Sequence, residues 1–387
     1  MFLRERAGSG EIMVRVEQKL KKILLIACDP GGANAIAGVY DILVKKGYEL
    51  SLYGKETAIK RYEFLGFKGK LIDFDDLDSE ESIRWFIQKQ NPGLIITGTS
   101  ANDYLEKKTW NIGRKMGIPV WAVLDQWMNY GIRFSRHHLK TLDKYLQEKD
   151  ISYRPDKIFV MDGDIKREMI DLGFDEKSLI DSGSPYFELL ANQKTKFKAN
   201  NENQIRLVYA SEPITQDYKS SDYWGYTEVL NFKCLLANLE KYAAEKHVKI
   251  HLLVKLHPRE SGDFYKTYRL NEDNSLISIE VIEGLTAFDW AEFDLDCVVG
   301  MSSMFLIEAA LIGIPIISLQ LNLKKENPFI LTRKKVIKTI ISGDELYEEL
   351  ESVLQNKLGQ NKSVIDYFKL NSSEVISREV EKIVWNS

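Results

Sequence analysis

The chain has few cysteines and no long apolar run, and each absence excludes a class of protein. Its 387 residues include three cysteines, Cys28, Cys234 and Cys297, which are odd in number and widely spaced. We therefore expect no disulfide framework and a reducing, cytoplasmic environment. No segment approaches the roughly 18–20 apolar residues of a membrane-spanning helix. Residues 1–19 are charged throughout, unlike a signal peptide, and are expected to form a disordered leader, with Met13 as an alternative start.

The chain also lacks a strong net charge and any metal-binding motif. Its formal charge is −4, so it has no overall basic field for nucleic acid. Its five histidines include the pair His137-His138 but no H-x-x-x-H spacing. We expect no metal and no cofactor apart from a bound co-substrate. The overall composition, with 44% hydrophobic and 28% charged residues, is ordinary for a globular protein. The length of the chain suggests two domains.

Short apolar runs alternate with helical segments along most of the chain. In the first half, apolar runs at 23–27, 94–97 and 157–160 are each followed by a helical pattern, and a further run at 118–124 is followed by a polar stretch. A second alternation has strand patterns at 206–210, 250–256, 297–299 and 316–319. Strands of this kind, alternating with helices, predict an α/β protein with parallel sheets. We expect two Rossmann-like domains facing a central cleft: one at 20–190, a polar linker at 191–204, a second at 205–360 and a closing C-terminal helix at 361–387.

The ends of the predicted strands in the second half carry polar side chains. Pro258 ends one apolar run and leaves His257 at its carboxyl end, because proline cannot continue a sheet ladder. Another run breaks at Gly300, and Ser302 and Ser303 precede a helical pattern. Serine is a preferred helix cap, and a helix N-terminus offers free N–H groups to an anion. This half is therefore expected to bind a phosphate or a phosphate-bearing leaving group, with Ser211 and Glu308 as further binding residues.

Two aspartates end strands in the first half and are candidates for the catalytic base. Asp29 lies in Cys28-Asp-Pro-Gly-Gly, which we interpret as a turn before a helix at 35–46, and Asp125 ends the apolar run at 118–124. Either carboxylate could remove a proton from a substrate, and the sequence leaves open which of them does so. The surrounding residues expected to contact that substrate are Gly31, Gly32, Trp127, Tyr130 and Arg133.

The motifs resemble those of GT-B glycosyltransferases and, more narrowly, of bacterial sialyltransferases and polysialyltransferases. The resemblance is carried by Lys-Leu-His-Pro at 255–258, by Ser302-Ser303 before a helix, and by the two Rossmann-like halves. It implies that 205–360 is the nucleotide-sugar donor domain, in which His257, Ser302 and Ser303 contact the phosphate of a CMP donor. It implies equally that 20–190 is the acceptor domain, in which an aspartate removes the proton of a sugar hydroxyl and the neighbouring residues contact the acceptor. It also implies a cytoplasmic enzyme that acts on a glycan or lipid-linked glycan, with peripheral contact at the inner membrane surface.

One motif of that group is missing. The family's acidic D/E-D/E-G tripeptide, which supplies the base, does not occur at a strand end; Asp125 and Asp29 are the nearest counterparts. Our first prediction is an inverting, metal-independent glycosyltransferase that moves sialic acid or a related ulosonic acid from CMP. The alternatives are a UDP-GlcNAc 2-epimerase-like enzyme and a CDP-glycerol-type phosphotransferase on the same fold.

Overall fold

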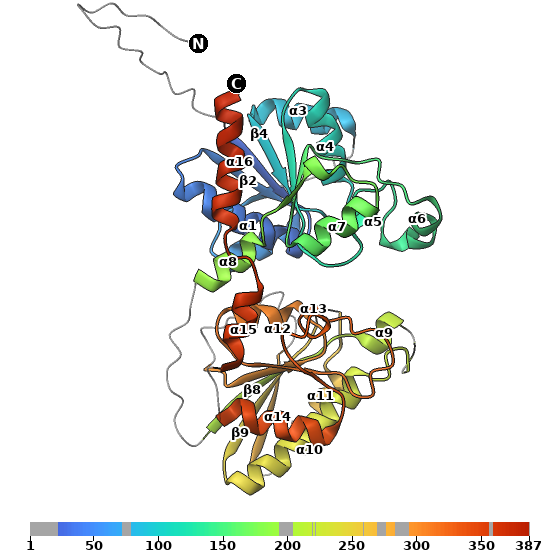
Figure 1. Ribbon diagram of the computed structural model, residues 1–387, viewed down its shortest axis with the longest axis vertical. Helices are drawn as coiled ribbons and strands as arrows, with labels where there is room; N and C mark the ends of the chain where they lie inside the picture. The colour runs from blue at the N-terminus through green and yellow to red at the C-terminus, as the bar shows by residue number, and fades with distance from the viewer. Residues whose placement is uncertain are drawn as a thin grey trace, which may run out of the picture. The chain divides into compact units, whose positions relative to one another are not determined.

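The computed structural model divides the chain into two compact units. It describes residues 22–71, 79–192, 204–218, 220, 222–257, 259–268, 276–282, 294–355 and 359–386 (Figure 1). Unit 1 comprises the chain up to residue 188 together with 369–387, and unit 2 comprises 189–368. The predicted leader, most of the predicted linker and Pro258 lie outside the described residues.

Unit 1 contains a seven-stranded parallel sheet. Its strands are apolar on both sides because helices cover both faces. The spatial order reverses direction between β1 and β4, which makes that pair the topological switch point. In spatial order the strands are β3 (Lys70–Leu71), β2 (Leu50–Gly54), β1 (Ile23–Ala27), β4 (Leu94–Thr97), β5 (Val120–Val123), β6 (Lys157–Val160) and β7 (Leu179–Asp181).

The first helix of unit 1 begins earlier than the sequence predicts. We expected a turn at 28–34, but the helix starts at Pro30. Asp29 caps it, and proline is well suited to the first helical position because no partner is needed for an N–H there. The helices are α1 (Pro30–Lys45), α2 (Glu56–Phe64), α3 (Glu80–Gln90), α4 (Leu105–Lys115), α5 (Tyr130–Arg133), α6 (Leu142–Glu148), α7 (Gly163–Asp171), α8 (Pro185–Asn192) and α16 (Ser372–Asn386), with 3₁₀ turns at Leu139–Thr141 and Glu176–Ser178.

The C-terminal helix α16 lies beside α1 in unit 1 (Figure 1). Ile376 and Val380 on α16 are fully buried in the same core cluster as residues of α1 and β1. Before the helix, the hydroxyl of Ser372 donates to the carbonyl of Ser182 at 2.9 Å. The last segment of the chain therefore completes the first unit.

Unit 2 contains a six-stranded parallel sheet whose switch point lies between β8 and β11. In spatial order the strands are β10 (Ile277–Ile282), β9 (Lys249–Lys255), β8 (Gln204–Ala210), β11 (Cys297–Gly300), β12 (Ile316–Leu319) and β13 (Thr339–Ile340). The helices are α9 (Ile214–Tyr218), α10 (Glu228–Lys246), α11 (Asp263–Lys266), α12 (Met304–Leu311), α13 (Ile330–Arg333), α14 (Gly343–Gln355) and α15 (Gly359–Tyr367).

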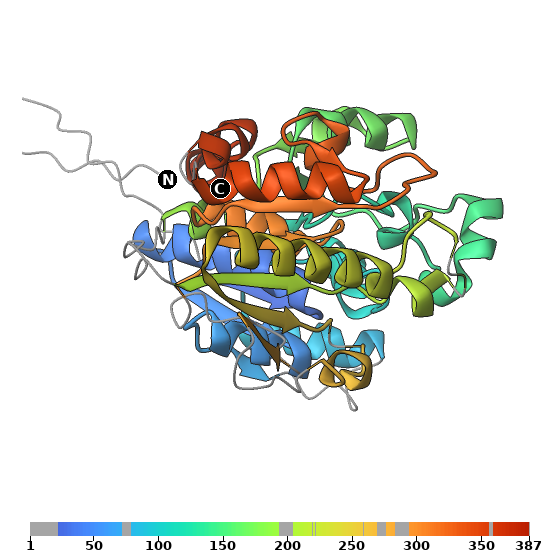
Figure 2. The same cartoon turned by 90° about the horizontal axis from the view of Figure 1, so that it is seen from below.

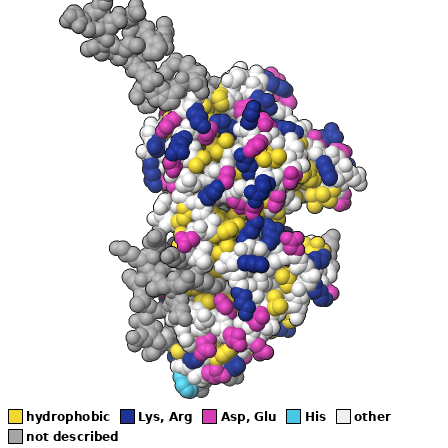
Figure 3. All heavy atoms as spheres, viewed as in Figure 1, with side chains coloured by type: hydrophobic (Ala, Val, Ile, Leu, Met, Phe, Trp, Pro, Cys, Tyr) yellow, Lys and Arg dark blue, Asp and Glu magenta, His cyan; other side chains and the backbone are white. Residues whose placement is uncertain are grey.

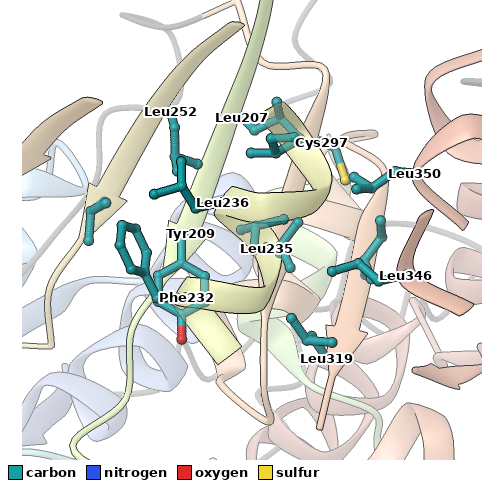
Figure 4. Close-up of a cluster of buried hydrophobic side chains, with 14 of the residues drawn as sticks. Leu207, Tyr209, Phe232, Leu235, Leu236, Leu252, Cys297, Leu319, Leu346 and Leu350 are labelled. Atoms are coloured by element: carbon teal, nitrogen blue, oxygen red, sulfur yellow. The ribbon is translucent and has the colours of Figure 1, made fainter. Parts of the chain in front are cut away.

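The core of unit 2 lies between its sheet and the neighbouring helices α10 and α14 (Figure 2). Figure 4 shows Leu207 and Tyr209 of β8 meeting Phe232 and Leu235 of α10, all with no exposed surface. Helix α12 contacts β11 and β12, and α15 packs against α12. These layers fix the loops at the carboxyl ends of β8 and β11.

The face shown in Figure 3 carries charges of both signs. On the face shown in Figure 3, lysine and arginine are interspersed with aspartate and glutamate on both units. Within the described part of the chain, no helix combines the length and apolar character needed to span a membrane.

Candidate functional sites

Each sheet presents a candidate site at the carboxyl end of its switch-point strands. Ligands of open α/β sheets bind there because the loops diverge and helix N-termini point toward the opening. In unit 1 this edge carries the loops after β1, β4 and β5, and in unit 2 the loops after β8, β9 and β11. We describe the two edges separately.

In unit 1 the two predicted base candidates both lie close to Gly31. Asp29 caps α1 by accepting a hydrogen bond from Gly32 N at 2.7 Å. A Cβ atom on Gly31 would lie 2.1 Å from Asp125 Oδ2 and 3.7 Å from Asp29 Oδ1. A Cβ on Gly32 would lie 3.4 Å from the Cα of Gly98, in the loop after β4. The structure therefore brings Asp29, Gly31, Gly32 and Asp125 together, and only glycine allows this approach.

Asp125 has the environment of an acid–base group. Its side chain is 9% exposed and forms an ion pair with Arg133, with Nη1 3.1 Å from Oδ1. The hydroxyl of Thr99 also lies 3.4 Å from Oδ1. Burial raises the pKa of Asp125 to about 6; the Arg133 guanidinium lowers it and the negative charge of Asp29 raises it. A carboxyl group with a pKa near neutrality can take up and release a proton at physiological pH.

The residues predicted to contact an acceptor form contacts within unit 1 itself. Arg133 is 5% exposed and, besides Asp125, donates to the carbonyl of Thr99 at 2.6 Å and to Gln126 Oε1 at 2.9 Å. Tyr130 is buried in a core cluster. Trp127 is partly buried and donates to Asp162 at 2.7 Å. These side chains hold the segment after β5 in place.

Sequence reasoning missed Glu106, which has no exposed surface. Its Oε1 accepts from Cys28 N at 3.1 Å and its Oε2 from Ser100 N at 2.5 Å, so one carboxylate joins the loops after β1 and β4. Burial, followed by the charge of Asp29, raises the pKa of Glu106 well above its usual range. A signal was present: Glu106 lies four residues before Trp110 and seven before Gly113, on the buried stripe of α4.

In unit 2, the predicted phosphate-binding groups are bonded to a glutamate that the sequence analysis did not identify. Glu212 Oε1 accepts from Ser302 N at 2.7 Å and Met301 N at 3.2 Å, and its Oε2 accepts from the Ser302 hydroxyl at 2.9 Å. Ser303 caps α12, because its hydroxyl accepts from Phe305 N at 3.2 Å. An internal carboxylate thus occupies the anion-binding groups at the switch point. Burial raises the pKa of Glu212.

A second glutamate, Glu260, connects two more predicted residues. Its Oε1 accepts from the hydroxyl of Ser211 at 2.7 Å and its Oε2 accepts from His257 N at 2.8 Å. Nδ1 of His257 accepts from Arg259 N at 3.3 Å, so the neutral ring carries its proton on Nε2. Burial and the positive charges of Arg259 and Lys255 lower the pKa of His257. The imidazole is therefore neutral at pH 7 and offers one N–H donor.

The remaining predicted residues of unit 2 have less specific surroundings. Gly300 ends β11, where a Cβ would lie 3.2 Å from that of Ala210, so its small size lets the two strands end side by side. Glu308 is partly buried on α12. Among the described residues, no group of three or more His, Cys, Asp or Glu is arranged to hold a metal ion.

Comparisons with known proteins find similar folds but no similar sequence family. No family model and no curated protein matches the sequence. Among solved structures, the chain is similar to a Listeria monocytogenes protein assigned as a UDP-N-acetylglucosamine 2-epimerase (14% identity, TM-score 0.66, 95% of this chain and 98% of that one). It is also similar to the UDP-GlcNAc 2-epimerase of Neisseria meningitidis bound to UDP-GlcNAc (12%, 0.62, 93% and 100%) and to Acinetobacter baumannii MurG (11%, 0.50, 94% and 99%).

These structures correct the functional prediction and confirm the fold prediction. CMP-dependent sialyl transfer is wrong as the first choice, because several of the structures that share the fold over more than nine tenths of the chain are UDP-GlcNAc 2-epimerases. The HP and SS motifs indicated the fold and not the narrower group, since one fold supports different chemistries. The predicted α/β class with two Rossmann-like domains is confirmed, and the chain has the GT-B fold.

Proposed function

We propose that this protein is a nucleotide-sugar enzyme that inverts carbon 2 of a UDP-N-acetylhexosamine, as a UDP-GlcNAc 2-epimerase does. The observation that carries the proposal is Asp125, a buried carboxyl group with a pKa of about 6, set beside Asp29 at the switch point of unit 1. The fold shared with 2-epimerases supports it.

Inversion at carbon 2 breaks the C–H bond and forms it again on the opposite face of the ring. Because carbon 2 is not adjacent to a carbonyl group, the electron pair of the broken bond must form a C1–C2 double bond as UDP leaves carbon 1, and UDP must add back to carbon 1 as the proton returns to carbon 2. A carboxylate can accept this proton and a carboxyl group can return it. Asp125, deprotonated in part at pH 7, is the first of these groups, and Arg133 fixes its orientation. Asp29, whose Oδ1 would lie 3.7 Å from the same Cβ position on Gly31, is the second.

Unit 2 is proposed to bind the nucleotide. The neutral His257 presents its Nε2–H to a phosphate oxygen, and Ser302 and the N-terminus of α12 provide further donors. Since Glu212 accepts from the same donors, the phosphate must displace its carboxylate.

Hydrogen exchange tests the reaction directly. The protein incubated with UDP-GlcNAc in D₂O, without any acceptor, is expected to introduce one deuterium at carbon 2, detected by proton NMR and mass spectrometry. UDP should raise the melting temperature and CMP should not. Absence of exchange, together with stabilisation by CMP alone, would contradict the proposal.

Glu212→Ala is expected to strengthen UDP binding about tenfold. The substitution removes a carboxylate that competes with the phosphate for the amides of Met301 and Ser302. Hydrogen bonds to a charged group contribute about 1.5–3 kcal/mol, which sets the scale of the change. Isothermal titration calorimetry with UDP measures it.

Glu228→Ala is the matched control for this measurement. Glu228 also accepts from a backbone amide and a hydroxyl, those of Thr215 at 3.1 and 3.0 Å, but not from the α12 loop. Its replacement should leave UDP affinity unchanged. Equal affinities for wild type and Glu212→Ala would show that the phosphate does not use these donors.

A further inference from the structure

Helix α4 begins with two adjacent charged residues that have no exposed surface, Glu106 and Lys107. A buried charge is costly unless hydrogen bonds satisfy it, so their contacts show what holds them there. Glu106 joins the loops after β1 and β4. Lys107 donates from Nζ to the carbonyl of Ile132 at 3.1 Å and to that of His137 at 2.9 Å.

The residues that Glu106 and Lys107 contact include the chain neighbours of Thr99 and Arg133, the two residues whose side chains contact Asp125. Ile132, held by Lys107, precedes Arg133, whose Nη1 is 3.1 Å from Asp125 Oδ1. Ser100, held by Glu106, follows Thr99, whose carbonyl accepts from Arg133 at 2.6 Å. The first turn of α4 therefore fixes the backbone on each side of the Asp125 site.

The far end of the same segment is anchored independently. Glu148 accepts from Arg136 Nη2 at 2.5 Å and lies 2.8 Å from His137 Nε2. Asp150 accepts from Arg136 N at 2.7 Å. Arg136 and His137, which follow this segment's Arg133, are thus paired with Glu148. Lys107 supplies the segment's buried attachment.

We propose that Lys107 is a positioning residue, which sets the Arg133 guanidinium against Asp125 through the carbonyls of Ile132 and His137. Lys107 does not touch the reacting atoms. It fixes the ends of a short backbone segment so that Arg133 faces the carboxylate. This inference rests on the proposed role of Asp125 in proton transfer.

The groups around Lys107 keep its ammonium group charged at neutral pH. Burial lowers its pKa to about 8, with the charges of Glu106, Asp103 and Asp150 opposing that effect and Arg133 adding to it. Its ammonium also lies 5.2 Å from the ring centroid of Tyr104. Lys107 therefore remains protonated at neutral pH.

The test measures Asp125 itself, in the full chain without substrate. Titration of ¹³Cγ-labelled aspartate by NMR, with Asp125→Asn used to assign the signal, gives the pKa of Asp125 in each variant. Lys107→Met should raise that pKa by about one unit, because Arg133 is no longer held in place. Lys115→Met, which removes an exposed lysine of the same helix, should leave it unchanged.

A double-mutant cycle separates positioning from the simple loss of a positive charge. If Lys107 acts through Arg133, Lys107→Met has no effect on Asp125 in an Arg133→Met background. The same shift in both backgrounds, or no shift in either, would overturn the proposal. If Lys107→Met does not fold, Lys107→Gln, which can still donate to one carbonyl, gives the same comparison with a smaller shift. Because no substrate is used, a protein without C2 exchange but with the predicted shift would refute only the proposed function.

Discussion

Replacing Asp125 with asparagine is expected to reduce C2 hydrogen exchange about 10²- to 10⁴-fold, the usual contribution of a positioned acid or base. Asparagine has nearly the same shape and can still accept a hydrogen bond from Arg133, but it cannot take up the proton. UDP affinity should not change, because the nucleotide is proposed to bind unit 2. Turnover by NMR and UDP binding by calorimetry measure the two effects.

The pH dependence of stability shows whether Asp125→Asn has damaged the fold. The pKa of Asp125 is raised in the folded state from 3.8 to about 6, so the folded protein binds the proton more tightly than the unfolded chain. Wild type is therefore expected to lose about 3 kcal/mol from this group as the pH rises from 4 to above 6. Asp125→Asn lacks this loss. Its free energy of unfolding, compared with that of wild type, should therefore be higher at pH 8 than at pH 4.

Asp175→Asn provides the control for activity. Asp175 also accepts a hydrogen bond from a backbone amide, Lys177 N at 3.1 Å, but it is exposed and lies before β7, at the amino end of the strands. Asparagine can still accept this bond, so the variant should keep wild-type exchange. Comparable losses in both variants, or a marked loss of stability in Asp125→Asn at pH 8, would argue against a chemical role for Asp125.

Gly183→Ala is expected to destabilise unit 1 by about 3 kcal/mol. Gly183 has φ +73°, a region that costs other residues about 1–2 kcal/mol, and its added Cβ would lie 2.2 Å from the carbonyl oxygen of Lys369. The clash forces apart the contact that returns the C-terminal segment to unit 1, where Ser372 bonds to Ser182. Urea denaturation followed by circular dichroism measures the loss.

Gly47→Ala separates the two causes of that loss. Gly47 has a similar φ, +80°, but nothing lies within 4 Å of its added Cβ. It should cost only about 1 kcal/mol, the strain of the backbone alone. Equal losses in the two variants would mean that the approach of Lys369 to Gly183 contributes nothing to stability.

The positions of most strands could be predicted from the sequence, because a buried parallel strand is a short apolar run bounded by turn residues. Runs at 23–27, 94–97 and 157–160 coincide with β1, β4 and β6. The start of α1 could not be placed in the same way, since Pro-Gly-Gly is also typical of a turn. It is helical because the side chain of Asp29 satisfies Gly32 N.

The choice between sialyl transfer and C2 epimerisation could not be made from motifs alone. His257, Ser302 and Ser303 mark strand ends and a helix start, which many enzymes of this fold share. The structure adds that Glu212 already occupies the donors at Ser302, and that Asp125 has a proton-accepting environment in the other unit.

By itself, the sequence determined the α/β class, the two Rossmann-like halves, and the strand ends at which polar residues such as Asp29, Asp125 and His257 lie. Periodicity and turn chemistry are local, so they can be read without knowing the fold. Only the tertiary structure decided which acceptors satisfy the loop amides. Glu106 bonds to Cys28 from 78 residues away, and Glu212 bonds to Ser302 across 90 residues. Such partners depend on which strands become neighbours, and strand order arises from the packing of the whole sheet.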